Sequence, residues 1–107
     1  MGAKSRRKGK SGELEAAGEL RRLFGVDARR GRQYQGTDES PDVMTGIEGL
    51  HVEVKRTEKL RAYEAIRQAA EQCGTDVPVV LHRANRREWL AIVRLEDLPR
   101  LAWVLRQ

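Results

Sequence analysis

Apolar and polar residues alternate along residues 50–56 of this 107-residue chain. The apolar positions are Leu50, Val52 and Val54, and the polar positions between them are His51, Glu53 and Lys55. Successive side chains of a β-strand point to opposite faces, so this pattern predicts a strand with one apolar face and one charged face. We expect the apolar face to pack into a core and the charged face to be open to solvent.

A second short strand is predicted at residues 42–45, directly after Pro41. Proline has no backbone N–H to donate to a sheet, so it marks the entrance of a strand. The glycines of the segment 46–49 favour a hairpin turn into the strand at residues 50–56. Such a hairpin brings Asp42 close to Glu53.

Residues 11–24 have the spacing of an amphipathic helix that Ser11 caps and Gly25 follows. At about 100° per residue, one apolar stripe forms. The stripe consists of Ala16, Ala17, Leu20, Leu23 and Phe24. Glu13 falls near the centre of this stripe, whereas Glu15 and Glu19 fall on the other side. A carboxylate in the position of Glu13 either caps the helix or belongs to an active site.

The rest of the chain predicts further strands and helices in alternation. A strand is expected within residues 26–35, and a helix after Thr57 that carries the stripe Tyr63, Ile66, Ala70 and Cys73 and ends at Gly74. Strands at 77–82 and 89–93 precede a helix at 96–105, with Pro99 in its first turn. This order predicts an α/β fold with a central mixed five-stranded sheet flanked by helices.

The chain has a formal net charge of +5, which favours a polyanionic partner. We expect residues 1–10 to be a flexible basic tail and residues 11–107 to be a single domain. The tail either binds phosphates or serves solubility alone. A single cysteine and short apolar runs argue against a disulfide framework and a membrane span. They favour a reducing, cytoplasmic setting.

Two carboxylates and a lysine on one hairpin suit metal-dependent phosphodiester hydrolysis. Mg²⁺ prefers hard oxygen ligands and keeps several waters, so Asp42, Glu53 and the backbone carbonyl of Val54 are sufficient protein ligands, with Mn²⁺ as a substitute. Lys55 can orient the attacking water or neutralise charge on the phosphate. The alternative is that Glu53 and Lys55 form an exposed strand face and Asp42 is a turn residue.

The segments Pro41-Asp42 and Glu53-Val54-Lys55 resemble the PD-(D/E)XK nuclease motif. The stretch 8–13, Lys-Gly-Lys-Ser-Gly-Glu, is similar to the N-terminal part of the archaeal and phage Holliday junction resolvases of that superfamily. The resemblance implies a restriction-endonuclease-like core and a helix-borne acid, Glu13, that reaches the metal through a water. It also implies that Asp42 and Glu53 are metal ligands and Lys55 is the catalytic lysine.

The substrate suggested by this resemblance is branched DNA, namely the four-way junction, cut by a homodimer with one site per subunit. Alternatives are a nuclease of the same chemistry that acts on flaps, ends or duplex, and a DNA-binding module without activity. The candidate DNA contacts are basic residues and one serine: Lys4, Arg6, Arg7, Lys8, Lys10, Arg29, Arg30, Arg32, Ser40, Arg56, Lys59 and Arg61.

Several other polar and aromatic residues have more than one interpretation. We expect His51 to be a solvent-facing strand residue in preference to a catalytic one. Gln68 and Gln72 either face the site or lie on a polar helix surface, and the surface is favoured. Tyr34 can stack on a base, whereas core or subunit-interface positions are favoured for Trp89 and Trp103.

Overall fold

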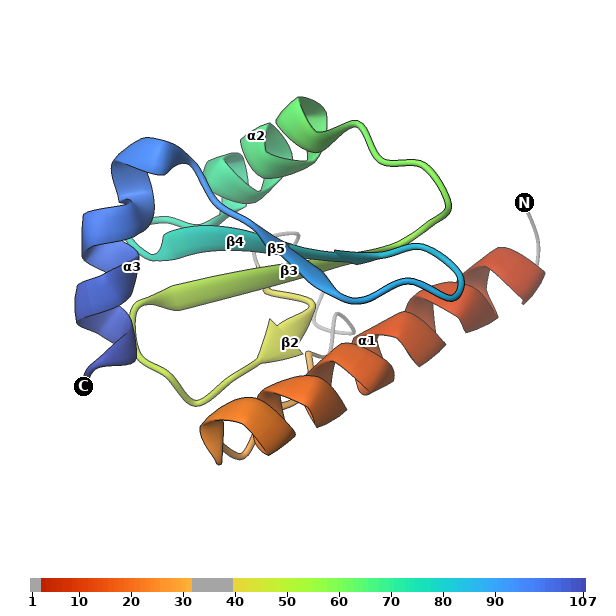
Figure 1. Ribbon diagram of the computed structural model, residues 1–107, viewed down its shortest axis with the longest axis horizontal. Helices are drawn as coiled ribbons and strands as arrows, with labels where there is room; N and C mark the ends of the chain where they lie inside the picture. The colour runs from red at the N-terminus through yellow and green to blue at the C-terminus, as the bar shows by residue number, and fades with distance from the viewer. Residues whose placement is uncertain (1–2, 32–39) are drawn as a thin grey trace.

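The computed structural model of the protein describes the backbone of residues 3–31 and 40–107, and side chains from residue 9 onward within these ranges. Its elements follow one another as shown in Figure 1. They are α1 (Ala3–Phe24), β1 (Arg29–Arg30), β2 (Val43–Met44), β3 (Leu50–Arg56), α2 (Ala62–Gln72), β4 (Val77–Arg83), β5 (Leu90–Ile92), a 3₁₀ turn η1 (Leu95–Asp97) and α3 (Leu98–Leu105).

The five strands form one mixed sheet in the order β1-β2-β3-β4-β5. The pairs β1–β2, β2–β3 and β4–β5 are antiparallel, and β3–β4 is parallel. A parallel pair needs a crossover, which α2 supplies between β3 and β4. The predicted α/β architecture, with its order of helices and strands and its hairpin, is confirmed.

Each helix covers part of the sheet with small or branched apolar residues. Figure 1 shows α1 on one side of the sheet and α2 on the other. The α1 layer packs Ala16, Ala17 and Leu20 against Val52 and Val54. The α2 layer packs Ala65, Ile66 and Ala69 against Val80, and Val104 of α3 packs on Val77 and Val79. The alternation predicted for β3 therefore does place its valines in the core.

Helix α1 begins at Ala3, eight residues before the predicted start at Ser11. The segment assigned to the basic tail is thus helical from residue 3, and Ser11 lies inside the helix instead of capping it. Lysine, arginine and alanine are good helix formers, and adding a residue to an existing helix is easier than starting one. The predicted stripe also ends early, because Leu23 and Phe24 are exposed.

The expectation that the charged face of β3 is open to solvent is wrong for His51, which is 3% exposed. The parallel register places His51 beside Pro78 and Glu53 beside Val80, on the face that α2 covers. Alternation along one strand shows which residues share a face, but it does not show that a later helix packs over that face. This polar face is partly an interior one.

The aromatic residues differ in burial: Trp89 packs in the interior, whereas Trp103 and Tyr63 lie on the surface. Trp89 packs against the α1 layer and donates from Nε1 to Glu15 Oε1 at 3.1 Å, which fits the favoured core position. Trp103 is 64% exposed and Tyr63 is 92% exposed, so neither is a core residue. In the described part of the chain, no helix is long and apolar enough to cross a membrane.

Candidate active site

Asp42 lies where three strands meet, and its backbone is held from both sides. Its carbonyl oxygen accepts from Gly31 N at 2.7 Å, and its N–H donates to Val52 O at 2.9 Å. These contacts join the end of β1, the start of β2 and the middle of β3. Pro41 cannot donate to a ladder, so regular pairing of β2 begins only after Asp42. The aspartate is therefore rigidly placed at the start of a strand.

The side chains of Asp42 and Glu53 add two hydrogen bonds to the backbone pairing of the hairpin. Asp42 Oδ2 accepts a hydrogen bond from Val54 N at 2.8 Å, and Glu53 Oε2 accepts one from Asp42 N at 3.2 Å. The predicted proximity of the two carboxylates is confirmed. Because N–H and C=O of one strand residue point to the same edge, the Val54 carbonyl also faces the Asp42 side of β3.

Asp42 is an acid in a place that disfavours its charge. The pKa of Asp42 is raised to about 6, chiefly by burial and also by the carboxylates of Glu53 and Glu13, against the lowering effects of the Val54 N–H and of Lys55. Glu13, Glu53 and Lys55, the other three residues expected at the site, thus all act electrostatically on Asp42. Neighbouring carboxylates supply the hard oxygen ligands that Mg²⁺ prefers.

Glu13 reaches this region from α1 and is held by an arginine of β1. Arg30 Nε donates to Glu13 Oε1 at 2.6 Å, and the Glu13 side chain is only 17% exposed. The helix comes close to β3 at Gly12, where an added Cβ would lie 2.6 Å from Arg56 Cβ. The inward position predicted for Glu13 is confirmed, and its ion pair with Arg30 was not predicted.

The donor set fits a cation that retains much of its water. Within residues 3–31 and 40–107, no three or more His, Cys, Asp or Glu side chains form a group that could hold a metal ion. Two adjacent carboxylates, Asp42 and Glu53, with the Val54 carbonyl nearby, remain as candidate ligands. This set suits Mg²⁺, which is usually bound through one or two carboxylates and several waters, better than it suits Zn²⁺.

Gly31 is a structural residue of the site that the sequence pattern did not single out. A Cβ at this position would collide with the backbone carbonyl of Pro41 and approach that of Asp42 at 3.3 Å. The close approach lets the Gly31 N–H reach the Asp42 carbonyl. A glycine within the basic run of residues 29–32 was the available signal.

The candidate DNA contacts differ in how much of each side chain is available. Lys10, Lys59, Arg29 and Arg61 are exposed, although Arg29 pairs with Asp27 and Arg61 with Glu64. Arg30 is 40% exposed beside Glu13, and Ser40 is half-buried. Arg32 and Tyr34, and the side chains of Lys4, Arg6, Arg7 and Lys8, lie outside the described residues.

Arg56 belongs to a network inside the protein. Its Nη1 donates to Arg83 O at 3.2 Å and to Asn85 Oδ1 at 3.1 Å, and its side chain is 15% exposed. Glu15 Oε1 accepts from Arg83 and lies 3.9 Å from Arg56 Nε, which ties α1 to the ends of β3 and β4. A direct contact of Arg56 with phosphate therefore stays a prediction.

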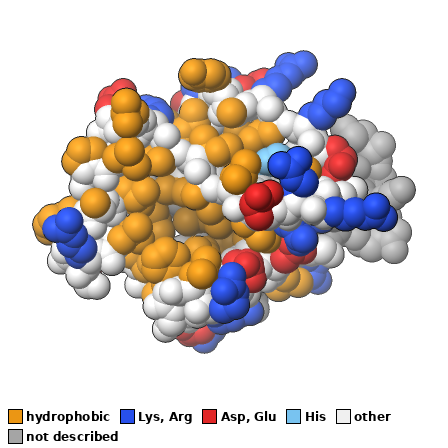
Figure 2. Space-filling view, in the orientation of Figure 1, with side chains coloured by type: hydrophobic (Ala, Val, Ile, Leu, Met, Phe, Trp, Pro, Cys, Tyr) orange, Lys and Arg blue, Asp and Glu red, His pale blue; other side chains and the backbone are white. Residues whose placement is uncertain are grey.

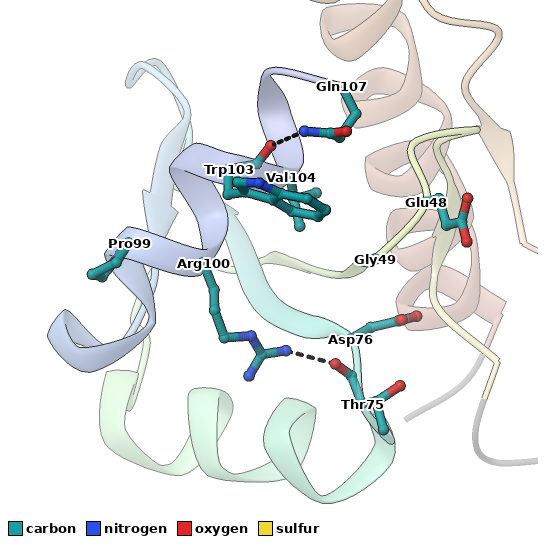
Figure 3. A pocket seen from close by; sticks show the side chains of 9 residues that line it. All are labelled: Glu48, Gly49, Thr75, Asp76, Pro99, Arg100, Trp103, Val104 and Gln107. Carbon is teal, nitrogen blue, oxygen red and sulfur yellow. Dashed lines mark hydrogen bonds between the residues drawn. The ribbon is translucent and has the colours of Figure 1, made fainter.

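Two large hollows lie away from the acidic residues. One of about 810 Å³ lies between α3 and the segments that precede β3 and β4, with Arg100 Nη2 donating to Thr75 O at 2.6 Å (Figure 3). The other, of about 970 Å³, lies between α2 and the chain that follows β5. Neither is lined by Asp42, Glu53 or Lys55, so the candidate chemistry lies on the β2–β3 hairpin and not in these hollows.

Comparisons of this chain with family models, with curated proteins and with solved structures gave no match.

Proposed function

We propose that this protein is a metal-dependent, structure-selective DNA endonuclease that resolves four-way junctions. The proposal depends chiefly on the placement of two carboxylates together on the β2–β3 hairpin, where Glu53 accepts from Asp42 N and Asp42 accepts from Val54 N. Lys55 follows Glu53 on the same strand face, and Glu13 approaches from α1. The resemblance of Asp42, Glu53 and Lys55 to the PD-(D/E)XK motif supports the cleavage chemistry, and the similarity of residues 8–13 to Holliday junction resolvases supports the substrate class.

The electrostatics of the site support binding of a divalent cation. Deprotonated Asp42 is disfavoured by burial and by two neighbouring acids, so a cation between the carboxylates would relieve an unfavourable interaction. Asp42, Glu53 and the Val54 carbonyl would hold Mg²⁺. When bound, Mg²⁺ supplies positive charge beside the scissile phosphate and favours ionisation of a nearby water.

The protein groups then position water and phosphate for hydrolysis. The water oxygen bonds to phosphorus, the bond from phosphorus to the leaving sugar oxygen breaks, and that oxygen takes up a proton. Lys55 donates hydrogen bonds to the attacking water or to a phosphate oxygen, where its charge opposes the developing negative charge. Arg30 holds Glu13 beside this centre, so that Glu13 contributes a fixed carboxylate at the edge of the site.

Basic groups on the surface are suited to the phosphates of the junction arms. Figure 2 shows many of the lysine and arginine side chains toward the end of the molecule where α1 begins. The proposed contacts are Lys10, Lys59, Arg29 and Arg61, with the basic residues of the first turns of α1. Contacts of this type read backbone shape instead of sequence and weaken steeply with salt.

Two symmetrical cuts are most simply made by a homodimer, and an apolar surface supports this stoichiometry. Figure 2 shows apolar side chains gathered on the opposite part of the same face, over β5 and α3. Exposed large apolar residues in β5, η1 and α3 are Leu90, Leu95, Leu98, Trp103 and Leu105. Such a concentration is typical of a surface that a partner covers.

The cysteine of the chain, Cys73, is a buried free thiol. A free thiol fits the reducing cytoplasm, which we propose as the location of the protein.

The test compares cleavage of a four-way junction, a flap and a linear duplex at one salt concentration, with Mg²⁺ or with EDTA. We expect Mg²⁺-dependent cutting that is fastest on the junction. Asp42→Asn should bind the junction as wild type does and should not cut it. Equal rates on all three substrates would overturn the junction preference alone.

Absence of Mg²⁺-dependent cutting on every substrate, with binding retained, would instead favour a DNA-binding module without activity. Normal cutting by Asp42→Asn would show that the metal site has been assigned to the wrong residues. Mn²⁺ in place of Mg²⁺ should also support cleavage, because it accepts the same oxygen ligands.

A further inference from the structure

His51 is a buried polar residue to which the proposed chemistry gives no role. Its Nε2 lies 3.1 Å from Glu53 Oε2, and the two side chains are 4% and 15% exposed. Among the described residues, this buried nitrogen has no partner in hydrogen-bonding alignment. Leaving such a group unsatisfied costs about 1–3 kcal/mol. The Glu53 carboxylate is at hydrogen-bonding distance, so a small rotation of either side chain aligns the pair.

The His51 ring lines a small pocket next to the candidate site. A small pocket of about 310 Å³ lies beside the ring, under the C-terminal end of α2. Its walls are Pro41, His51, Glu71, Gln72, Cys73, Gly74 and Asp76. The ring therefore lies between the end of a helix and a carboxylate of the candidate site, with the residue that precedes Asp42 at its side.

We propose that His51 is a positioning residue that donates from Nε2 to Glu53 Oε2 and so fixes the orientation of the Glu53 carboxylate. This inference rests on the proposed function. Oε2 already accepts from Asp42 N at 3.2 Å. With a second donor on Oε2, the carboxylate cannot rotate about its last bond without losing both contacts, and Oε1 is the oxygen presented for a cation. Hydrogen bonds to a ligating carboxylate commonly change metal affinity by 10- to 100-fold.

The experiment measures Mn²⁺ binding at fixed pH by the full-length protein, without DNA, through the paramagnetic signal of unbound Mn²⁺. His51→Leu removes the donor and keeps an apolar side chain of similar volume. We expect it to weaken Mn²⁺ binding at least 10-fold. His51→Gln can place an amide N–H near the position of Nε2, and we expect it to keep the affinity within about threefold of wild type.

A matched control comes from the same pocket. Cys73→Ala alters the part of the pocket wall that follows α2 and should leave the Mn²⁺ affinity unchanged even where it lowers the thermal midpoint. If His51→Leu does not fold, His51→Asn replaces it, since its shorter amide reaches only the position of Nδ1. At saturating Mn²⁺, junction cleavage by the folded variant should recover to within a few-fold of wild type.

Wild-type affinity in folded His51→Leu or His51→Asn, beside a wild type that binds Mn²⁺, would overturn the inference and leave the proposed function standing. Equal loss of affinity in His51→Gln and His51→Leu would also overturn it, because packing alone would then explain the effect. A wild type that binds no Mn²⁺ would overturn both the inference and the proposed function.

Discussion

The carboxylates of Asp42 and Glu53 each accept a hydrogen bond from the backbone of the strand segment that carries the other. Asp42 Oδ2 accepts from Val54 N at 2.8 Å, and Glu53 Oε2 accepts from Asp42 N at 3.2 Å. The Asp42 carboxylate thus takes the place of a backbone acceptor for Val54 N, and Glu53 adds a second acceptor to an N–H that also donates to Val52 O. The same two carboxylates are the candidate ligands of a cation. Strand pairing and the proposed metal binding therefore depend on the same side chains.

Asp42→Asn should stabilise the metal-free protein at neutral pH. The folded-state pKa of about 6 lies above the unfolded value of about 3.9, so folding favours the protonated form. The stabilising contribution of this proton is full below pH 4 and is lost as pH rises through about 6. In EDTA at pH 7.5, we expect the free energy of unfolding of Asp42→Asn to exceed that of wild type by on the order of 1–3 kcal/mol.

Urea unfolding at pH 7.5 and pH 4 checks this sign, because the difference between the two proteins should disappear at pH 4. Asp27→Asn is the control, since Arg29 lowers the pKa of Asp27 and the substitution should not stabilise. Lower stability of Asp42→Asn at pH 7.5 would contradict the assignment of Asp42 as a destabilised acid.

Lys55→Arg should lose most of the cleavage activity even though the positive charge is kept. The guanidinium is larger and planar, and it cannot donate as a compact ammonium to a single water or phosphate oxygen. We expect single-turnover cleavage to fall about 100-fold or more, with junction binding unchanged. Lys59→Arg, which alters an exposed lysine of the following loop, should cleave as wild type does. Wild-type rates in Lys55→Arg would remove this lysine from the chemistry.

Glu13→Gln should slow cleavage, whereas Glu15→Gln should lower the stability of the fold. Glu13 pairs with Arg30 beside Asp42, so its loss should slow cleavage about 10-fold or more. Glu15 bonds to Arg83 and Trp89, so its loss should lower the free energy of unfolding by about 1 kcal/mol and leave cleavage nearly unchanged. Glu19→Gln, which loses only an exposed pair with Arg22, should change neither. Equal slowing of cleavage in all three variants would indicate a general effect of charge on α1.

Gly12→Ala and Gly9→Ala should have opposite effects on stability. A Cβ at residue 12 would lie 2.6 Å from Arg56 Cβ, so α1 must move away from β3, at a cost of roughly 1–3 kcal/mol. A Cβ at residue 9 meets nothing within 4 Å, and alanine is the better helix former by about 0.5–1 kcal/mol. Thermal and urea unfolding of the two variants measure this difference. A neutral Gly12→Ala would show that the helix is not closely packed at this point.

The sequence predicted those features that follow from local periodicity. Alternation along β3, the glycines after β2 and Pro41 before it were enough to place Asp42 opposite Glu53. Helical spacing was enough to turn Glu13 inward. These patterns reflect the backbone geometry of strands and helices, which neighbouring elements seldom override.

Other features depend on contacts between distant parts of the chain, and the sequence did not predict them. The burial of His51 depends on where α2 packs, and the network of Arg56 depends on the turn after β4. The N-terminal extension of α1 depends on continuation of a helix that tertiary packing stabilises from residue 12 onward. None of these contacts produces a periodic pattern in the sequence around the residues that make it.

The early start of α1 also has a geometric consequence for substrate handling. Ten residues of helix separate Ala3 from Glu13, a rise of about 15 Å at 1.5 Å per residue. On a duplex arm parallel to this helix, that length corresponds to roughly four base pairs at about 3.4 Å each. In the nuclease that we propose, the first turns of α1 would therefore contact the DNA a fixed number of base pairs from the bond that is cut.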